Sequence, residues 1–149
     1  MTKLGTSADN QPDRPVNREL SSASNTFKKA ERLKHQAGFD FLFDKGKRID
    51  RKSFQVMYSF DYPAKHLSHI LMGAFAVPKR NFKKAVTRNL LKRRMRESWR
   101  TNNQTLKNLL LEKKRNLVVS IRYKSKEIFD YKLIESEMRE IIRLLEGKV

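Results

Sequence analysis

The sequence contains no cysteine. This absence excludes a disulfide framework and any zinc site built on thiolates. No apolar run approaches the roughly 18 residues needed to cross a bilayer, so we expect no membrane-spanning helix. The first twenty residues also lack an apolar core, so we expect no secretory signal and a cytoplasmic protein.

Acidic side chains are scarce. Only 16 Asp and Glu residues face 34 Lys and Arg residues in a chain of 149, which gives a formal net charge of +18. A surplus of this size repels itself unless a polyanion lies nearby. Nucleic acid, an acidic protein and an anionic membrane are the partner classes that fit.

Large aliphatic side chains are rare over residues 1–26, where Ser, Asn, Thr, Asp and Pro dominate. Such a segment buries too little apolar surface to offset the entropy lost on ordering. We therefore predict a disordered N-terminal extension over residues 1–26 and one folded domain over residues 27–149. The length of the chain also favours a single domain.

The spacing of apolar residues predicts the element order α-β-β-α-β-α. Glycine, proline and capping residues set the expected ends. The fold class is α+β: a single-domain α/β sandwich with a small mixed sheet and helices packed on it. The expected helices cover residues 36–45, 83–102 and 130–145, with further turns within 101–115. The expected strands cover residues 54–60, 70–77 and 117–121, with a small strand near Arg48.

Positive charge is concentrated between Lys79 and Arg100, where ten basic residues stand against one acid, Glu97. A solvated helix face normally mixes both signs, so this pattern favours phosphate binding. Guanidinium groups match phosphate oxygens in pairs, and an asparagine can bind sugar or phosphate without adding charge. At about 100° per residue, the helix separates two sets of side chains. We expect Val86, Leu90, Leu91 and Met95 to pack on the sheet, with Trp99 as a packing residue at the border. We expect Arg88, Asn89, Lys92, Arg93 and Arg96 to face RNA.

The stretch KKAVTRNLLKRRMRES, residues 83–98, closely resembles the signature helix of the bacterial ribonuclease P protein subunit. The pairs Arg88-Asn89, Lys92-Arg93 and Arg96-Glu97 match the core of that motif. The stretch AFAVPKR, residues 74–80, resembles the strand that leads into the family's Lys-rich turn. Residues 32–48 resemble its opening segment, and the whole likeness covers about residues 33–145.

This resemblance implies a fold like the second domain of a small-subunit ribosomal protein, with a left-handed β-α-β crossover. It also implies a subunit that binds a catalytic RNA and assists endonucleolytic removal of the 5′ leader from precursor tRNA. The implied contacts to the catalytic RNA are Lys84, Arg88, Asn89, Lys92, Arg93 and Arg96. The implied leader cleft, between the first helix and the sheet, involves Phe39, Phe43, Lys79 and Arg80.

Three positions qualify the likeness to the leader cleft. Phe39 and Phe43 stand at the paired aromatic positions, yet aromatics at i and i+4 are often core residues, so both roles stay open. Met57 stands where some family members carry an aromatic side chain on the cleft strand. Pro78 replaces a residue that is commonly small.

The sequence offers no obvious protein catalytic centre. A metal-dependent nuclease needs clustered carboxylates, and we expect Glu135, Glu137 and Glu140 to face solvent instead. His66 and His69 lie in a loop without a partner motif, and no Gly-rich phosphate loop is present. We therefore expect the catalytic centre in the RNA, with Mg²⁺ entering through the RNA component and no metal bound by a protein motif.

Three alternatives compete with this interpretation. A ribosomal or assembly protein of similar fold would bind RNA without processing precursor tRNA. A DNA-binding role is disfavoured because dimerisation heptads and helix-turn-helix spacing are missing. A membrane-surface role is disfavoured because the basic helix has no broad apolar face beyond its own core contacts. The expected partners are thus the catalytic RNA and precursor tRNA, with neither DNA nor a membrane.

Overall fold

The structure, a computed structural model, describes residues 27–63, 65 and 69–149. The predicted disordered extension over residues 1–26 lies outside this part. Four strands form one sheet in the order β1-β2-β4-β3. They are β1 (Lys47–Asp50), β2 (Phe54–Phe60), β3 (Leu71–Ala76) and β4 (Leu117–Tyr123).

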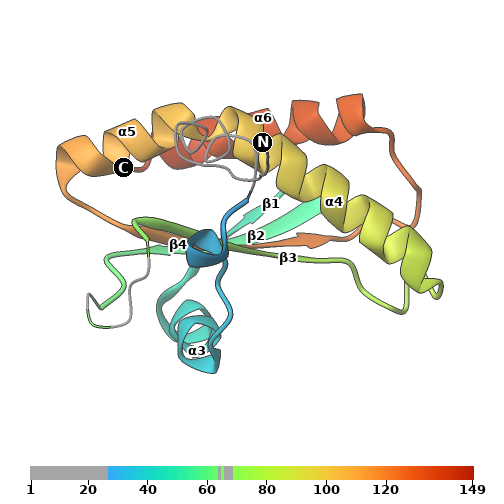
Figure 1. Cartoon of the computed structure of the whole chain (residues 1–149), viewed down its shortest axis with the longest axis horizontal. Helices are drawn as coiled ribbons and strands as arrows, with labels where there is room; N and C mark the ends of the chain where they lie inside the picture. Colours follow the sequence, from blue (N-terminus) through green and yellow to red (C-terminus); the bar gives the residue numbers. More distant parts are fainter. Residues whose placement is uncertain (1–26, 64, 66–68) are drawn as a thin grey trace, which may run out of the picture.

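Helices cover both faces of this sheet (Figure 1). On one face lie α4 (Ala85–Asn102), α5 (Gln104–Lys113) and α6 (Tyr131–Glu146). On the other face lies α3 (Gln36–Lys45), preceded by the short 3₁₀ helix η1 (Lys29–Glu31). This mixed α+β sandwich confirms the predicted fold class, and each predicted element is present.

The pairing of the strands gives the sheet its mixed character. Strand β2 pairs antiparallel with both β1 and β4, whereas β3 and β4 are parallel neighbours. The chain runs from β3 through α4 and α5 into β4, which is the predicted β-α-β crossover. The left-handedness of this crossover stays a prediction. The outer edge of β3 is extended by an isolated bridge between Arg32 and Gly73.

Two apolar clusters hold the layers together. The larger lies between the sheet and helices α4, α5 and α6, and includes Phe54, Val56, Trp99, Leu117 and Ile121. The smaller lies on the α3 face and consists of Leu33, Leu42, Tyr62, Met72 and Val118. Alternate strand residues point to opposite faces, so β2, β3 and β4 each contribute to both clusters.

Helix α6 begins as predicted, because the side chain of Asp130 accepts a hydrogen bond from the Leu133 amide at 3.0 Å. The prediction that its glutamates face solvent was wrong. Glu137 accepts hydrogen bonds from the amide and the hydroxyl of the fully buried Ser53, at 3.1 and 2.6 Å. Glu140 pairs with Arg51, and Glu135 accepts from the amide side chain of Asn102. These carboxylates fasten α6 to its neighbours.

Candidate RNA interface

Helix α4 packs on the sheet through a narrower arc than the sequence predicted. Its buried residues are Leu91, Met95, Ser98 and Trp99. The expectation that Val86 anchors the helix was wrong, because its side chain is 80% exposed. At about 100° per residue, Val86 lies about 140° from Leu91, whereas the four buried residues share an arc of about 100°. Trp99 supplies the apolar surface expected from Val86, and Leu90 is half-buried.

The outward side of α4 carries three cations that no carboxylate neutralises among the described residues. Arg93 is exposed, while Lys92 and Arg96 are half-buried. Burial, together with the nearby charges of Arg32 and Arg93, lowers the pKa of Arg96. Its guanidinium still carries its charge at neutral pH, because the ordinary pKa of arginine lies far above neutrality. Asn89 is exposed on the same side. This arrangement can hold phosphate oxygens.

Three other arginines of α4 are occupied by the protein itself. Arg88 donates from Nη1 to the carbonyls of Phe82 and Lys83, both at 2.8 Å. Arg94 donates to the carbonyl of Phe129 at 2.5 Å, and Arg100 pairs with Glu97. Arg88 is therefore half-buried next to the buried side of α4, and it fastens the turn before this helix in addition to any contact with RNA.

The turn between β3 and α4 extends the cationic side of the helix. Lys79 and Arg80 are exposed at its tip, and Lys84 is the exposed N-cap residue of α4. The carbonyl of Pro78 accepts hydrogen bonds from the amides of Asn81 and Phe82, at 3.1 and 3.3 Å. These bonds close the turn.

The structure separates the two predicted leader-binding aromatics. Phe39 is half-buried and packs against the smaller cluster, whereas Phe43 is 71% exposed. Leu42 takes the core position between them, and Phe41 makes an edge contact with Tyr62 at 5.0 Å between ring centroids. Phe43 is thus available for base stacking, while Phe39 also serves the core.

The sheet face beside α3 carries a polar row that the sequence pattern did not reveal. The strand register places Asp50, Gln55, Arg122 and Ala76 side by side. Arg122 is half-buried, and its Nη1 donates to the side-chain oxygen Oε1 of Gln55 at 3.1 Å. The available signal was the alternation in residues 117–123, where Ser120 and Arg122 share the face opposite the large core. A neighbouring row contains Arg48, Met57, Ser120 and Ala74.

Metal-binding clusters of three or more His, Cys, Asp or Glu side chains do not occur among the described residues. Within the same part of the chain, every helix is too short or too polar to span a membrane.

Comparisons with known proteins agree with one another. The sequence model of the family described as Ribonuclease P matches residues 27–146. The ribonuclease P protein component of Porphyromonas gingivalis is 27% identical over 129 residues, covering 87% of this chain and 93% of the relative. That of Nitrosococcus oceani is 36% identical over 83 residues, covering 54% of this chain and 63% of the relative.

A solved structure of the Staphylococcus aureus RNase P protein shares the fold, with a TM-score of 0.58 and 21% identity over 78% of this chain and 95% of that one. Because the family match covers most of the sequence, this chain belongs to the ribonuclease P family, as a protein component of that enzyme.

Proposed function

We propose that this protein binds the catalytic RNA of ribonuclease P through the outward side of α4. The observation that supports this proposal most strongly is that Lys92, Arg93 and Arg96 lie together with no carboxylate partner among the described residues. Clustered guanidinium groups repel one another, and phosphate oxygens relieve that repulsion through paired hydrogen bonds. With six to eight such contacts, log affinity falls against log salt with a slope of about −5 to −7.

The 5′ leader of precursor tRNA is assigned to the sheet face beside α3. The exposed ring of Phe43 offers a stacking surface, worth about 1–3 kcal/mol per base. Arg122 adds a cation on the sheet, and Lys79 with Arg80 add two more at the adjoining turn. A single strand needs this combination of stacking surface and positive charge.

The cleavage reaction itself is assigned to the catalytic RNA, which also holds the Mg²⁺ ions. The positive field of the protein reduces repulsion between two polyanions, the catalytic RNA and the substrate. Its benefit is therefore large at low magnesium and shrinks as magnesium or monovalent salt rises. We expect this protein to act in the cytoplasm.

The test is to identify the RNA that co-purifies with the protein and to assay that pair on precursor tRNA. Faster cleavage with protein than with RNA alone at low magnesium supports the proposal. Equal rates would contradict it. Tight RNA binding without any processing would favour the ribosomal or assembly role, and equal affinity for duplex DNA would favour a general polyanion binder.

A further inference from the structure

Strand β1 is an outer strand of the sheet, and β2 is the only strand that pairs with it among the described residues. The Arg51 amide donates to the Phe54 carbonyl at 2.8 Å, in register with the β1–β2 pair. Along an antiparallel pair, successive residues alternate between hydrogen-bonded and non-hydrogen-bonded positions. The main-chain groups of Arg48 and Asp50 therefore face away from β2, and they can pair with a further strand.

A cavity of about 520 Å³ opens at the beginning of this strand. Lys45 and Lys47 line it where α3 passes into β1, and Lys148 lines it just after α6. These three cavity lysines are all exposed. Lys45 lies 3.8 Å from the carboxylate of Asp44, whereas Lys47 and Lys148 have no carboxylate partner in the part of the chain that the structure describes. The volume is in the range typical of ligand sites.

Arg115 holds the far wall of the cavity in place. Its Nη2 donates to Oδ2 of Asp61 at 3.0 Å, and its Nη1 donates to the main-chain oxygen of Val149 at 3.2 Å. Its guanidinium also lies over the Phe60 ring, 4.4 Å from the centroid. Because Arg115 is already bound, the cavity lysines are the cations that remain for a ligand. Tyr58 adds a donor, since no hydrogen bond within the described residues engages its hydroxyl.

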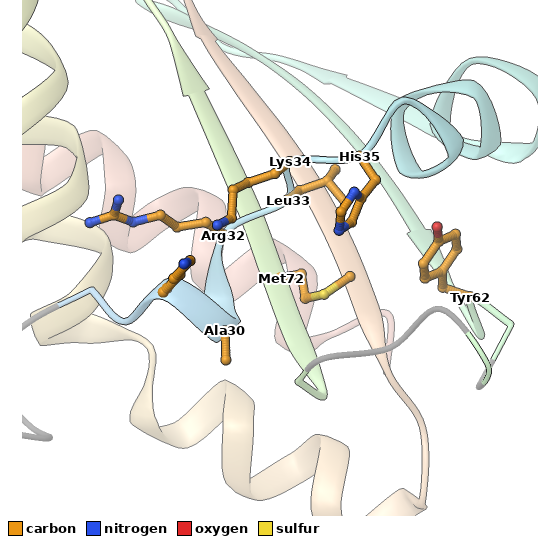
Figure 2. A pocket seen from close by; sticks show the side chains of 8 residues that line it. Ala30, Arg32, Leu33, Lys34, His35, Tyr62 and Met72 are labelled. Carbon is orange, nitrogen blue, oxygen red and sulfur yellow. The ribbon is translucent and has the colours of Figure 1, made fainter.

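This cavity lies away from the outward side of α4 and from the leader face beside α3. Strands β1 and β3 are the two outer strands, about 14 Å apart at about 4.8 Å per strand. Helix α4 lies over β3, where Trp99 contacts Phe75. The cavity that Figure 2 shows also lies beside β3, at Met72. Lys47 pairs with Tyr58 of the large cluster, so both side chains point to the sheet face opposite α3.

The chemistry of this edge favours a peptide over RNA. The edge offers main-chain donors and acceptors at strand spacing, and an extended peptide matches both with its own main chain. A phosphate group has no donor for the carbonyls of the edge. A second copy of this chain would bring a further formal net charge of +18, so the two copies would repel each other.

We propose that the open edge of β1 and the cavity beside it bind an extended acidic segment of a partner protein. The segment pairs with the main chain of Arg48 and Asp50. Alternate side chains of the added strand point to the face of Lys47, so acidic residues at every second position reach the cavity lysines. The other positions are uncharged, because they lie beside the exposed carboxylate of Asp50. The outward side of α4 stays available to RNA.

The probe is a peptide of about eight residues in which Thr and Glu alternate, because threonine favours extended chains. Fluorescence anisotropy gives its affinity for the full-length protein. Lys47→Ala/Lys148→Ala should bind it about three- to tenfold more weakly, because each exposed ion pair contributes modestly. Lys113→Ala/Lys132→Ala removes equal charge from exposed positions on α5 and α6. This control should bind the peptide within about twofold of wild type.

The main-chain pairing is tested by comparing Arg48→Pro with Arg48→Ala. Both variants lose the charge, but only proline removes the outward amide, and edge strands tolerate proline. Arg48→Pro should therefore bind the peptide at least about threefold more weakly than Arg48→Ala. Hydrogen exchange gives a direct readout on the wild-type protein. When about nine-tenths of the protein is bound, exchange at the Arg48 and Asp50 amides should slow about tenfold.

Peptide binding without slower exchange at these two amides would overturn the proposal, and so would equal affinities of the cavity variant and its control. No binding at about 1 mM peptide would also overturn it. Slower exchange caused by the catalytic RNA alone would assign the edge to RNA, and slower exchange at high protein concentration alone would assign it to a second copy; either result contradicts the proposal. If Arg48→Pro fails to fold, hydrogen exchange on wild type decides. Arg93→Ala should bind the peptide like wild type, which separates this test from that of RNA binding.

Discussion

Arg88 fastens the turn before α4 and, under the proposed function, also contacts the catalytic RNA, so its replacement tests both roles. The Arg88→Ala change removes two hydrogen bonds from a charged donor to the carbonyls of Phe82 and Lys83. A hydrogen bond to a charged group contributes about 1.5–3 kcal/mol when well buried. Because this side chain is half-buried, and water replaces part of what is lost, we expect a total cost of about 1–2 kcal/mol.

The assay compares Arg88→Ala with Arg93→Ala, an exposed arginine on the same helix. Urea unfolding gives the free energy of unfolding, and filter binding gives the affinity for the catalytic RNA. Arg93→Ala should change the free energy of unfolding by less than about 0.5 kcal/mol while weakening RNA binding. Arg88→Ala should do both, so its RNA binding must be measured where the variant is fully folded.

Equal unfolding free energies for the two variants would refute this reasoning, because the carbonyl contacts of Arg88 would then contribute nothing. Unchanged RNA binding in folded Arg88→Ala would assign Arg88 to the turn alone. Arg88→Lys adds a further check. Lysine keeps the positive charge but lacks the planar guanidinium fork. Relative to Arg88→Ala, the Arg88→Lys variant should therefore restore a smaller fraction of the lost unfolding free energy than of the lost RNA affinity.

Three further predictions concern the fold. Trp99→Ala should cost about 3–5 kcal/mol of unfolding free energy, because the ring is 1% exposed within the large core; a cost below 1 kcal/mol in urea unfolding would contradict that packing. Glu137→Ala should cost about 1–3 kcal/mol because it leaves the buried amide and hydroxyl of Ser53 without their acceptor, whereas exposed Glu112→Ala should be neutral. Burial alone would raise the pKa of Glu31, but hydrogen bonds from Lys107 and the Lys28 amide hold it below its ordinary 4.5. The stability this carboxylate contributes is thus present above about pH 4.5 and is lost as pH falls through the folded-state pKa. The melting temperature of Glu31→Gln should therefore fall less on acidification than that of the wild-type protein. An identical fall in both proteins would contradict a stabilising role for the Glu31 carboxylate.

Apolar periodicity predicted the elements of this fold well. Helix α3 covers residues 36–45 as predicted, and the Asp130 cap of α6 depends only on residues three positions apart. Periodicity did not reveal which of two apolar arcs of α4 meets the sheet. That choice depends on how Trp99 packs with Phe75 of β3, at 6.1 Å between ring centroids.

The missed functional details all depend on contacts between distant parts of the chain. The partners of Glu137 and Glu140 lie 84 and 89 residues earlier in the sequence. Arg122 joins the face beside α3 only through the register of β4 against β2. Phe39 and Phe43 are four residues apart on one helix, yet only the sheet beneath α3 decides which of them is covered.

The central claim is that the outward cations of α4 hold the catalytic RNA, which performs the chemistry. The most direct measurement is the single-turnover rate of precursor-tRNA cleavage at low magnesium, at a limiting protein concentration. The Lys92→Ala/Arg93→Ala protein is compared with wild type and with Lys113→Ala/Lys132→Ala, which removes equal charge from exposed positions on α5 and α6. We predict that the rate enhancement given by the Lys92→Ala/Arg93→Ala protein is at least about tenfold smaller than that of wild type, whereas the control double variant keeps the full enhancement. High magnesium should abolish the difference between the two variants. Full enhancement by the α4 pair, or cleavage by the protein without RNA, would contradict the account.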